Sequence, residues 1–201
     1  MRIALGIERG IVAAMKVRES GMPEQSYWEG LFDISGVLDA LKIDQQLEDA
    51  VEVGCGYGTF TLPVAQRIRG TLHTFDIEPG MVEITRARAN ASGVGNVRVA
   101  VRDVIKDGFG LPASSVNAVM LFNILHAENP VEMLRAASEV VRPGGRVLAI
   151  HWRSDVPTPR GPDLSIRPRP EQIAAWGSEV GLRSQPSLLL PPWHFGIVLE
   201  R

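Results

Sequence analysis

The residues best suited to chemistry in this sequence are three glycines at alternate positions, Gly54, Gly56 and Gly58. They follow the short apolar run of residues 50–53, which is typical of a buried strand, and a helical pattern begins just after them. Glycine allows a tight turn and a close approach of the backbone to a ligand, and free amides at a helix start point toward it. We therefore expect a ligand-binding turn; the alternative is a strand-to-helix turn without a ligand.

The spacing of these glycines separates two classes of cofactor. The dinucleotide fingerprint is G-x-G-x-x-G or A, and its third small residue allows the helix to pack closely on the strand. Here that third position is Thr59, whereas the third glycine stands at position 58. The pattern therefore disfavours a pyrophosphate-binding site for a nicotinamide dinucleotide.

Two aspartates follow later strands. Asp76 ends the expected strand 72–75, roughly 20 residues after Gly54, where a carboxylate can accept hydrogen bonds from both hydroxyls of a ribose. Asp103 follows the next strand, where an acceptor beside a free backbone amide can bind the amino edge of adenine. The alternatives are that Asp76 caps the helix beginning at Pro79 and that Asp103 only forms a turn.

The elements that position these residues alternate along the middle of the chain. Short apolar or alternating runs predict strands, and apolar residues at helical spacing predict the helices between them. Such an alternation forms βαβ units around a parallel sheet. The expected strands cover residues 50–53, 72–75, 97–101, 116–122 and 146–150, with helices over 62–68, 79–91 and 130–141.

The two ends of the chain differ from this pattern. Residues 1–48 are predicted to be mostly helical, with helices over 3–18, 24–32 and 34–41. Near the other end, repeated prolines predict a stiff, non-helical loop over 156–170. A short helix over 173–180 and an antiparallel pair of strands over 182–190 and 193–199 are expected to complete the sheet.

The composition sets broad limits on function. The 201 residues are 45% hydrophobic and 22% charged, which suits one compact domain. A net charge of −2 disfavours nucleic acid as a partner, and no apolar run approaches the roughly 20 residues of a membrane span. The single cysteine suits a reducing cytoplasm and excludes a multi-cysteine zinc site. We expect a cytoplasmic protein that holds no metal.

These motifs together resemble the class I S-adenosylmethionine-dependent methyltransferases over residues 48–152. The segment 52–58 resembles the first motif of that family, and 142–146 resembles its Pro-Gly-Gly turn before strand five. The segment 122–126 is similar to the one that faces the methyl group and the acceptor. The resemblance assigns cofactor binding to Glu52, Gly54, Cys55, Gly56, Tyr57, Gly58, the ribose acid Asp76, the adenine-packing Ile77, the adenine-reading pair Asp103 and Val104, and Asn123.

The resemblance implies an α/β fold: a Rossmann-like, seven-stranded, mostly parallel sheet with helices on both faces and a C-terminal antiparallel hairpin. It divides the chain into a helical N-terminal segment, residues 1–48, as a candidate lid, and a methyltransferase domain, residues 49–201. The Pro- and Arg-rich loop 153–170 falls on the substrate side. The closest likeness is to the broad branch that methylates quinones, sterols and other small molecules.

The acceptor side has fewer candidates. His126, and after it His151, could act as a general base, because histidine can be neutral at physiological pH; the alternative is that both only shape the pocket. The other substrate-side candidates, each with packing or solvation as its alternative, are Tyr27, Trp28, Trp152 and Arg153.

The implied reaction is transfer of a methyl group from S-adenosylmethionine to a small-molecule acceptor by in-line displacement, which leaves S-adenosylhomocysteine. Three alternatives stay open: an RNA or protein methyltransferase, a nicotinamide-dependent oxidoreductase, and a non-catalytic protein that binds S-adenosylmethionine. The sequence leaves the acceptor atom and the oligomeric state open.

Overall fold

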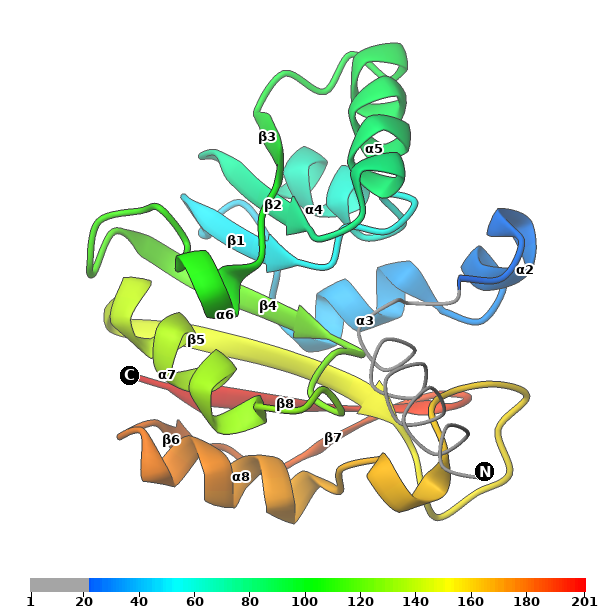
Figure 1. Cartoon of the computed structure of the whole chain (residues 1–201), viewed down its shortest axis with the longest axis vertical. Helices are drawn as coiled ribbons and strands as arrows, with labels where there is room; N and C mark the ends of the chain where they lie inside the picture. Colours follow the sequence, from blue (N-terminus) through cyan, green and yellow to red (C-terminus); the bar gives the residue numbers. More distant parts are fainter. Residues whose placement is uncertain (1–21) are drawn as a thin grey trace, which may run out of the picture.

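A single sheet of eight strands organises the computed structural model, which describes residues 22–201 (Figure 1). The strand order is β3-β2-β1-β4-β5-β8-β6, and β7 also pairs with β8. The first five strands are parallel, and β8 runs antiparallel to β5. The strands are β1 (Ala50–Val53), β2 (Leu72–Asp76), β3 (Val97–Val101), β4 (Val116–Phe122), β5 (Val141–Trp152), β6 (Arg183–Ser184), β7 (Leu188–Leu190) and β8 (His194–Glu200).

The expected parallel sheet and C-terminal antiparallel strands are confirmed, but the expected strand number of seven is corrected to eight. The run 182–190 forms two short strands, β6 and β7, instead of one. Both pair with β8, β6 through Arg183 opposite Glu200 and β7 through Leu190 opposite His194. Pro186 lies between them, and a proline cannot donate to a strand ladder, so the pairing is interrupted there.

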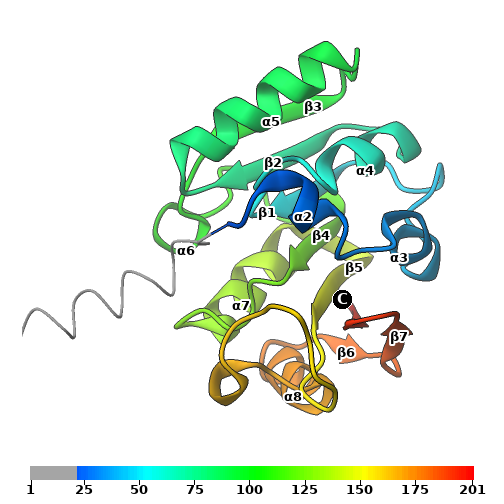
Figure 2. The same ribbon diagram turned by 90° about the vertical axis from the view of Figure 1, so that its right-hand side faces the viewer.

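Helices cover both faces of this sheet (Figures 1 and 2). Because side chains alternate along a strand, Met120 of β4 packs with the layer that holds α3 and α4, whereas Leu121 packs with the layer that holds α7 and α8. The helices are α2 (Gln25–Glu29), α3 (Ile34–Ala40), α4 (Thr61–Arg67), α5 (Pro79–Ala91), α6 (Val104–Asp107), α7 (Pro130–Val140) and α8 (Pro170–Glu179), with a 3-10 turn, η1 (Leu164–Ile166).

Most of the helices and strands follow the sequence pattern. The fifth strand is an exception, because β5 begins at Val141, so the Pro-Gly-Gly segment expected to precede a strand over 146–150 lies within it. Two short elements are additional. These are α6 and η1, of which η1 falls inside the loop 156–170 that was expected to contain no helix. The helix expected over 3–18 lies outside the described residues. Among residues 22–201, none of the helices combines the length and the apolar character that crossing a membrane requires.

Candidate cofactor and acceptor site

A cavity of about 460 Å³ opens at the carboxyl ends of the parallel strands. Nine of the residues assigned to the cofactor contribute to its lining, together with three of the acceptor-side residues. The nine are Glu52, Gly54, Cys55, Gly56, Asp76, Ile77, Asp103, Val104 and Asn123, and the three are Trp28, His126 and Trp152. Tyr57, Gly58, Tyr27, His151 and Arg153 lie outside that lining.

The glycine turn between β1 and α4 uses left-handed backbone conformations at all three glycines, with φ of +82° at Gly54, +50° at Gly56 and +76° at Gly58. A Cβ atom at Gly58 would lie 2.8 Å from Cδ1 of Leu62 and 3.2 Å from Oγ1 of Thr85, so these side chains would have to shift to accommodate any other residue. Cys55 is buried within the turn, and burial raises the pKa of its thiol. The turn therefore presents backbone to the cavity, with a neutral thiol between its glycines.

Asp76 at the end of β2 is bonded to this turn. Its Oδ2 accepts from the backbone N–H of Gly56 at 3.0 Å, and its Oδ1 accepts from the N–H of Glu78 at 3.0 Å. Burial raises the pKa of Asp76, against the effect of these two hydrogen bonds. Each carboxylate oxygen has a second lone pair, so the group can still accept from two ligand hydroxyls.

Glu52 of β1 is the most deeply buried acid of the site. Its Oε2 accepts from Oγ1 of Thr61 at 2.5 Å and from Oγ1 of Thr74 at 2.7 Å, and the residue is 3% exposed. Burial raises the pKa of Glu52 to about 7, although the two threonine hydroxyls lower it; the nearby Asp76 raises it further. At neutral pH the cavity therefore contains a carboxyl group that is close to half protonated.

Three apolar side chains also line the cavity. Ile77 remains 41% exposed although it lines the cavity, and Val104 and Ile105 contribute to the same lining. Asp103 is the N-cap of α6, and its Oδ1 accepts from the N–H groups of Ile105 and Lys106 at 3.1 and 3.2 Å. An exposed apolar side chain beside a carboxylate suits a planar base with an amino edge.

At the end of β4, Asn123 has a left-handed backbone conformation and a buried side-chain oxygen that has no hydrogen-bond partner among residues 22–201. Its φ is +57°, a left-handed value that only a few per cent of non-glycine residues adopt. Within the described part of the chain, its Oδ1 is buried without a hydrogen-bond partner. Because the residue lines the cavity, a ligand N–H or O–H would satisfy this oxygen.

The two histidine candidates contact one another. Nδ1 of His126 lies 3.2 Å from Nε2 of His151, and Nδ1 of His151 lies 3.5 Å from the carbonyl oxygen of Trp152. His126 lines the cavity, whereas His151 is fully buried in β5. Burial lowers the pKa of both rings, that of His151 to about 3, so both are neutral at physiological pH.

Aromatic rings wall the acceptor side. Trp28 of α2 packs edge-on against Trp152 of β5, with ring centroids 6.4 Å apart, and against Phe32 at 5.0 Å. Phe60 and Phe122 also line the cavity, and their ring centroids are 5.0 Å apart. These two phenylalanines were not among the candidate site residues predicted from sequence. Each belongs to an apolar segment that indicates a buried helix or strand and gives no sign of a ligand.

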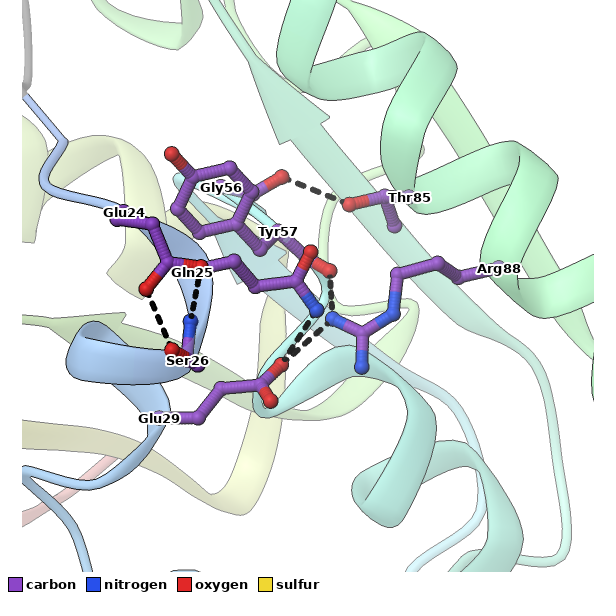
Figure 3. Close-up of polar contacts among 8 residues, drawn as sticks. All are labelled: Glu24, Gln25, Ser26, Glu29, Gly56, Tyr57, Thr85 and Arg88. Atoms are coloured by element: carbon purple, nitrogen blue, oxygen red, sulfur yellow. Dashed lines mark hydrogen bonds and ion pairs between the residues drawn. The ribbon is translucent and has the colours of Figure 1, made fainter.

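Side-chain bonds hold α2 against the glycine turn (Figure 3). Arg88 of α5 pairs with Glu29 at 2.8 Å and also donates to the carbonyl oxygen of Tyr57. The Tyr57 hydroxyl donates to the carbonyl oxygen of Pro23 at 2.7 Å. Tyr57, assigned to the cofactor from sequence, thus directs its hydroxyl to the N-terminal segment, and Trp28 reaches the cavity from that segment. The neighbouring Tyr27 is 47% exposed.

The Pro- and Arg-rich loop is organised by Arg167, which is 8% exposed. Its guanidinium donates to the carbonyl oxygen of Arg153 at 2.6 Å, to Oγ1 of Thr158 at 2.9 Å and to the carbonyl oxygen of Pro162 at 2.8 Å. The side chain of Arg153 makes a two-point pair with Asp155. The loop reaches the cavity instead through Arg160, Gly161, Pro162, Asp163 and Ile166.

The fold and the site together define a Rossmann-like domain that binds a nucleoside cofactor. The glycine turn follows β1, a carboxylate ends β2, and the ligand cavity lies at the carboxyl ends of the strands. The lining offers groups of the kind that a nucleoside cofactor needs: the Asp76 carboxylate as an acceptor, the apolar Ile77 side chain, and the unpartnered Oδ1 of Asn123. Among residues 22–201, no group of three or more His, Cys, Asp or Glu residues could hold a metal ion.

Comparisons with known proteins agree with this class. Residues 50–145 match the model of a family described as a methyltransferase domain. A solved S-adenosylmethionine-dependent methyltransferase from Aquifex aeolicus superimposes with a TM-score of 0.76 at 21% identity, over 92% of this chain and 97% of that one. The chain is therefore similar to a methyltransferase domain over just under half of its length, and its fold is that of the S-adenosylmethionine-dependent methyltransferase from Aquifex aeolicus.

Two curated relatives match part of the chain. Aklanonic acid methyltransferase DauC of Streptomyces sp. (strain C5) is 32% identical over 103 residues, which are 50% of this chain and 46% of that protein. Nocamycin O-methyltransferase of Saccharothrix syringae is 30% identical over 129 residues, 59% of this chain and 46% of that protein. The chain spans about half the length of the curated relatives it matches.

Proposed function

We propose that the chain transfers a methyl group from S-adenosylmethionine to a small-molecule acceptor. The observation that carries this proposal is one cavity whose lining contains Asp76 as well as Trp28 and His126. S-adenosylmethionine supplies an activated methyl group when bound, so the residues of the chain need to align the acceptor and exclude water.

The acceptor compartment favours a flat, largely apolar molecule. Its aromatic lining, Trp28, Phe60, Phe122 and Trp152, can stack on or pack edge-on against a ring system. The names of the two curated relatives, an aklanonic acid methyltransferase and a nocamycin O-methyltransferase, support an acceptor of small size.

The cofactor roles follow from the contacts of each residue. Asp76 is proposed to accept from both ribose hydroxyls while it holds the Gly56 amide. Ile77 is proposed to pack on the adenine, and Asp103 with the amide of Val104 to bind its amino edge. Asn123 is proposed to accept from a donor on the cofactor or the acceptor through its unpartnered Oδ1.

Two segments are proposed to close the acceptor side. The N-terminal segment is proposed as a lid because, in its described part, residues 22–48, Trp28 lines the cavity and Glu29 pairs with Arg88. The loop 153–170 forms the opposite wall, with Arg167 as its internal anchor. A cytoplasmic location is part of the proposal, because the single cysteine, Cys55, is buried and suits a reducing compartment.

A turnover assay tests this proposal. The purified protein is incubated with methyl-labelled S-adenosylmethionine and a panel of aromatic hydroxy compounds, and labelled product is detected by mass spectrometry. Bulk RNA and a protein extract serve as rival acceptors in separate reactions. Label in a small molecule, lost in the Asp76→Asn variant, supports the proposal. Label only in RNA or protein, or binding of S-adenosylmethionine without turnover on any acceptor, contradicts it.

A further inference from the structure

The His126 and His151 rings contact one another but have different access to the cavity. The two are not equivalent, because His126 lines the cavity and His151 is fully buried, opposite Phe195 in the β5–β8 pairing. A ligand in the cavity can therefore reach His126 but not His151. Since Nδ1 of His126 faces His151, the ring nitrogen of His126 that remains for a ligand is Nε2.

We propose that His151 is a positioning residue that fixes the tautomer of His126, so that Nε2 of His126 receives the proton of a hydroxyl acceptor. This inference rests on the proposed methyl transfer and gives its acceptor a chemical class, an alcohol or phenol. It also makes His126 and His151 one pair with separate roles, in place of two independent candidate bases.

The carbonyl oxygen of Trp152 decides where the protons lie. A carbonyl only accepts, so we assign the proton of His151 to Nδ1, which lies 3.5 Å from this oxygen, at the long limit of a hydrogen bond. A neutral imidazole has one N–H, so Nε2 of His151 then has a lone pair and accepts from Nδ1–H of His126 at 3.2 Å. The remaining nitrogen, Nε2 of His126, is therefore an unprotonated acceptor.

The charges around the pair keep both rings neutral. Burial and the cation of Arg167 lower the pKa of His126, and burial, His126, Arg167 and His194 lower that of His151. Arg167 itself is fixed by the loop carbonyls of Arg153 and Pro162. On the cavity side the wall also carries Glu128, Arg160 and Asp163. Together these groups favour a ring that binds a proton only in the course of the reaction.

The proposed step joins methyl transfer to the loss of the acceptor's hydroxyl proton. The acceptor oxygen forms a bond to the methyl carbon while the carbon–sulfur bond breaks, and the electron pair of that bond stays on sulfur. The hydroxyl proton moves to Nε2 of His126 as the oxygen gains its third bond and becomes strongly acidic. A base of lowered pKa can accept that proton, because the transfer accompanies methyl transfer instead of preceding it.

The proton positions can be measured without turnover. In protein with ¹⁵N-labelled histidine, the four histidine rings are distinguished by single substitutions, with His73→Gln as the control on β2 outside the cavity. We expect the proton of His126 on Nδ1 in the wild type and a loss of this preference in His151→Leu. A proton on Nε2 of His126 in the wild type, or an unchanged tautomer in His151→Leu, overturns the proposal.

Kinetics provide the second readout. His151→Leu should lower kcat about 10- to 100-fold with little change in the KM of S-adenosylmethionine, whereas His151→Gln, whose amide oxygen can accept from His126, should recover most of the rate. The wild-type rate should fall at acid pH with an apparent pKa below 6.5, and this apparent pKa should shift in His151→Leu. An equal loss of kcat in His151→Leu and His151→Gln overturns the proposed role of His151. So does a pH–rate profile whose apparent acid pKa is the same in the wild type and in His151→Leu.

The two proposals can fail separately. If no acceptor is methylated but the His126 proton lies on Nδ1, the proposed function fails and the tautomer assignment stands. If methylation occurs and the His126 proton lies on Nε2, the proposed function stands and this inference fails. Circular dichroism and thermal unfolding of each variant establish that the fold is retained.

Discussion

Glu52 provides a quantitative prediction about cofactor binding. Its carboxyl group is buried beside the glycine turn, and its pKa is about 7, so it is close to half protonated at pH 7. S-adenosylmethionine carries a positive sulfonium and a positive ammonium group. A cation within roughly 4–6 Å lowers the pKa of a carboxyl group by about 1–3 units. We therefore expect cofactor binding to expel the remaining proton from Glu52.

The magnitude follows from the shift. A decrease of about 2 units takes the protonated fraction at pH 7 from about one half to about 1%, so that binding releases about 0.5 proton. At pH 8 only about a tenth of the free protein is protonated at Glu52, so the release should fall to about 0.1 proton. S-adenosylhomocysteine lacks the sulfonium charge and should release fewer protons.

The assay is isothermal titration calorimetry at pH 7 in buffers of different ionisation enthalpy. The slope of the observed enthalpy against the buffer enthalpy gives the number of protons released. Glu52→Gln keeps an oxygen that can accept from Thr61 and Thr74, and it should reduce the slope to near zero. The reasoning is refuted by a flat slope in the wild type, or by a slope that Glu52→Gln leaves unchanged, which would assign the proton to Asp76.

Two further predictions concern stability and the acceptor loop. Gly58→Ala, at φ +76° and with its Cβ 2.8 Å from Leu62, should destabilise the protein by about 1–3 kcal/mol, whereas Gly80→Ala in α5, where a Cβ meets nothing within 4 Å, should stabilise it by up to about 1 kcal/mol. Urea unfolding measures both, and a similar loss in the two variants contradicts the packing argument. Arg167→Met removes three hydrogen bonds and should cost roughly 3 kcal/mol, raising the KM of the acceptor more than that of S-adenosylmethionine. Equal changes in the two KM values would contradict a loop-anchoring role.

The sheet could be predicted because its central strands are short, mostly apolar runs that alternate with helical patterns. Glycines 54, 56 and 58 and Asp76 were recognisable because their chemistry depends on local spacing. The division of the run 182–190 into two strands was missed because its leucines indicate one continuous strand, and the interruption by Pro186 was not taken into account. The helix α6 was missed because four residues are too few to show a helical period.

The acceptor side depends on contacts between distant residues, which a single sequence does not show. Arg167 could be recognised as a cation, but its hydrogen bonds to Arg153 and Pro162 depend on the path of the folded loop. The His126–His151 contact could have been anticipated in part, because neighbouring parallel strands β4 and β5 bring their carboxyl ends together. The depth of His151 could not, because it depends on the pairing of β5 with β8.

The most direct test of the central claim, a cavity for S-adenosylmethionine, is calorimetric titration of the cofactor-stripped protein with S-adenosylmethionine, S-adenosylhomocysteine and NAD. We expect micromolar binding of the first two, no binding of NAD, and at least tenfold weaker binding of the first two to Asp76→Asn, about 1.4 kcal/mol or more. Binding of NAD alone, or an affinity for S-adenosylmethionine that Asp76→Asn leaves unchanged, would contradict it.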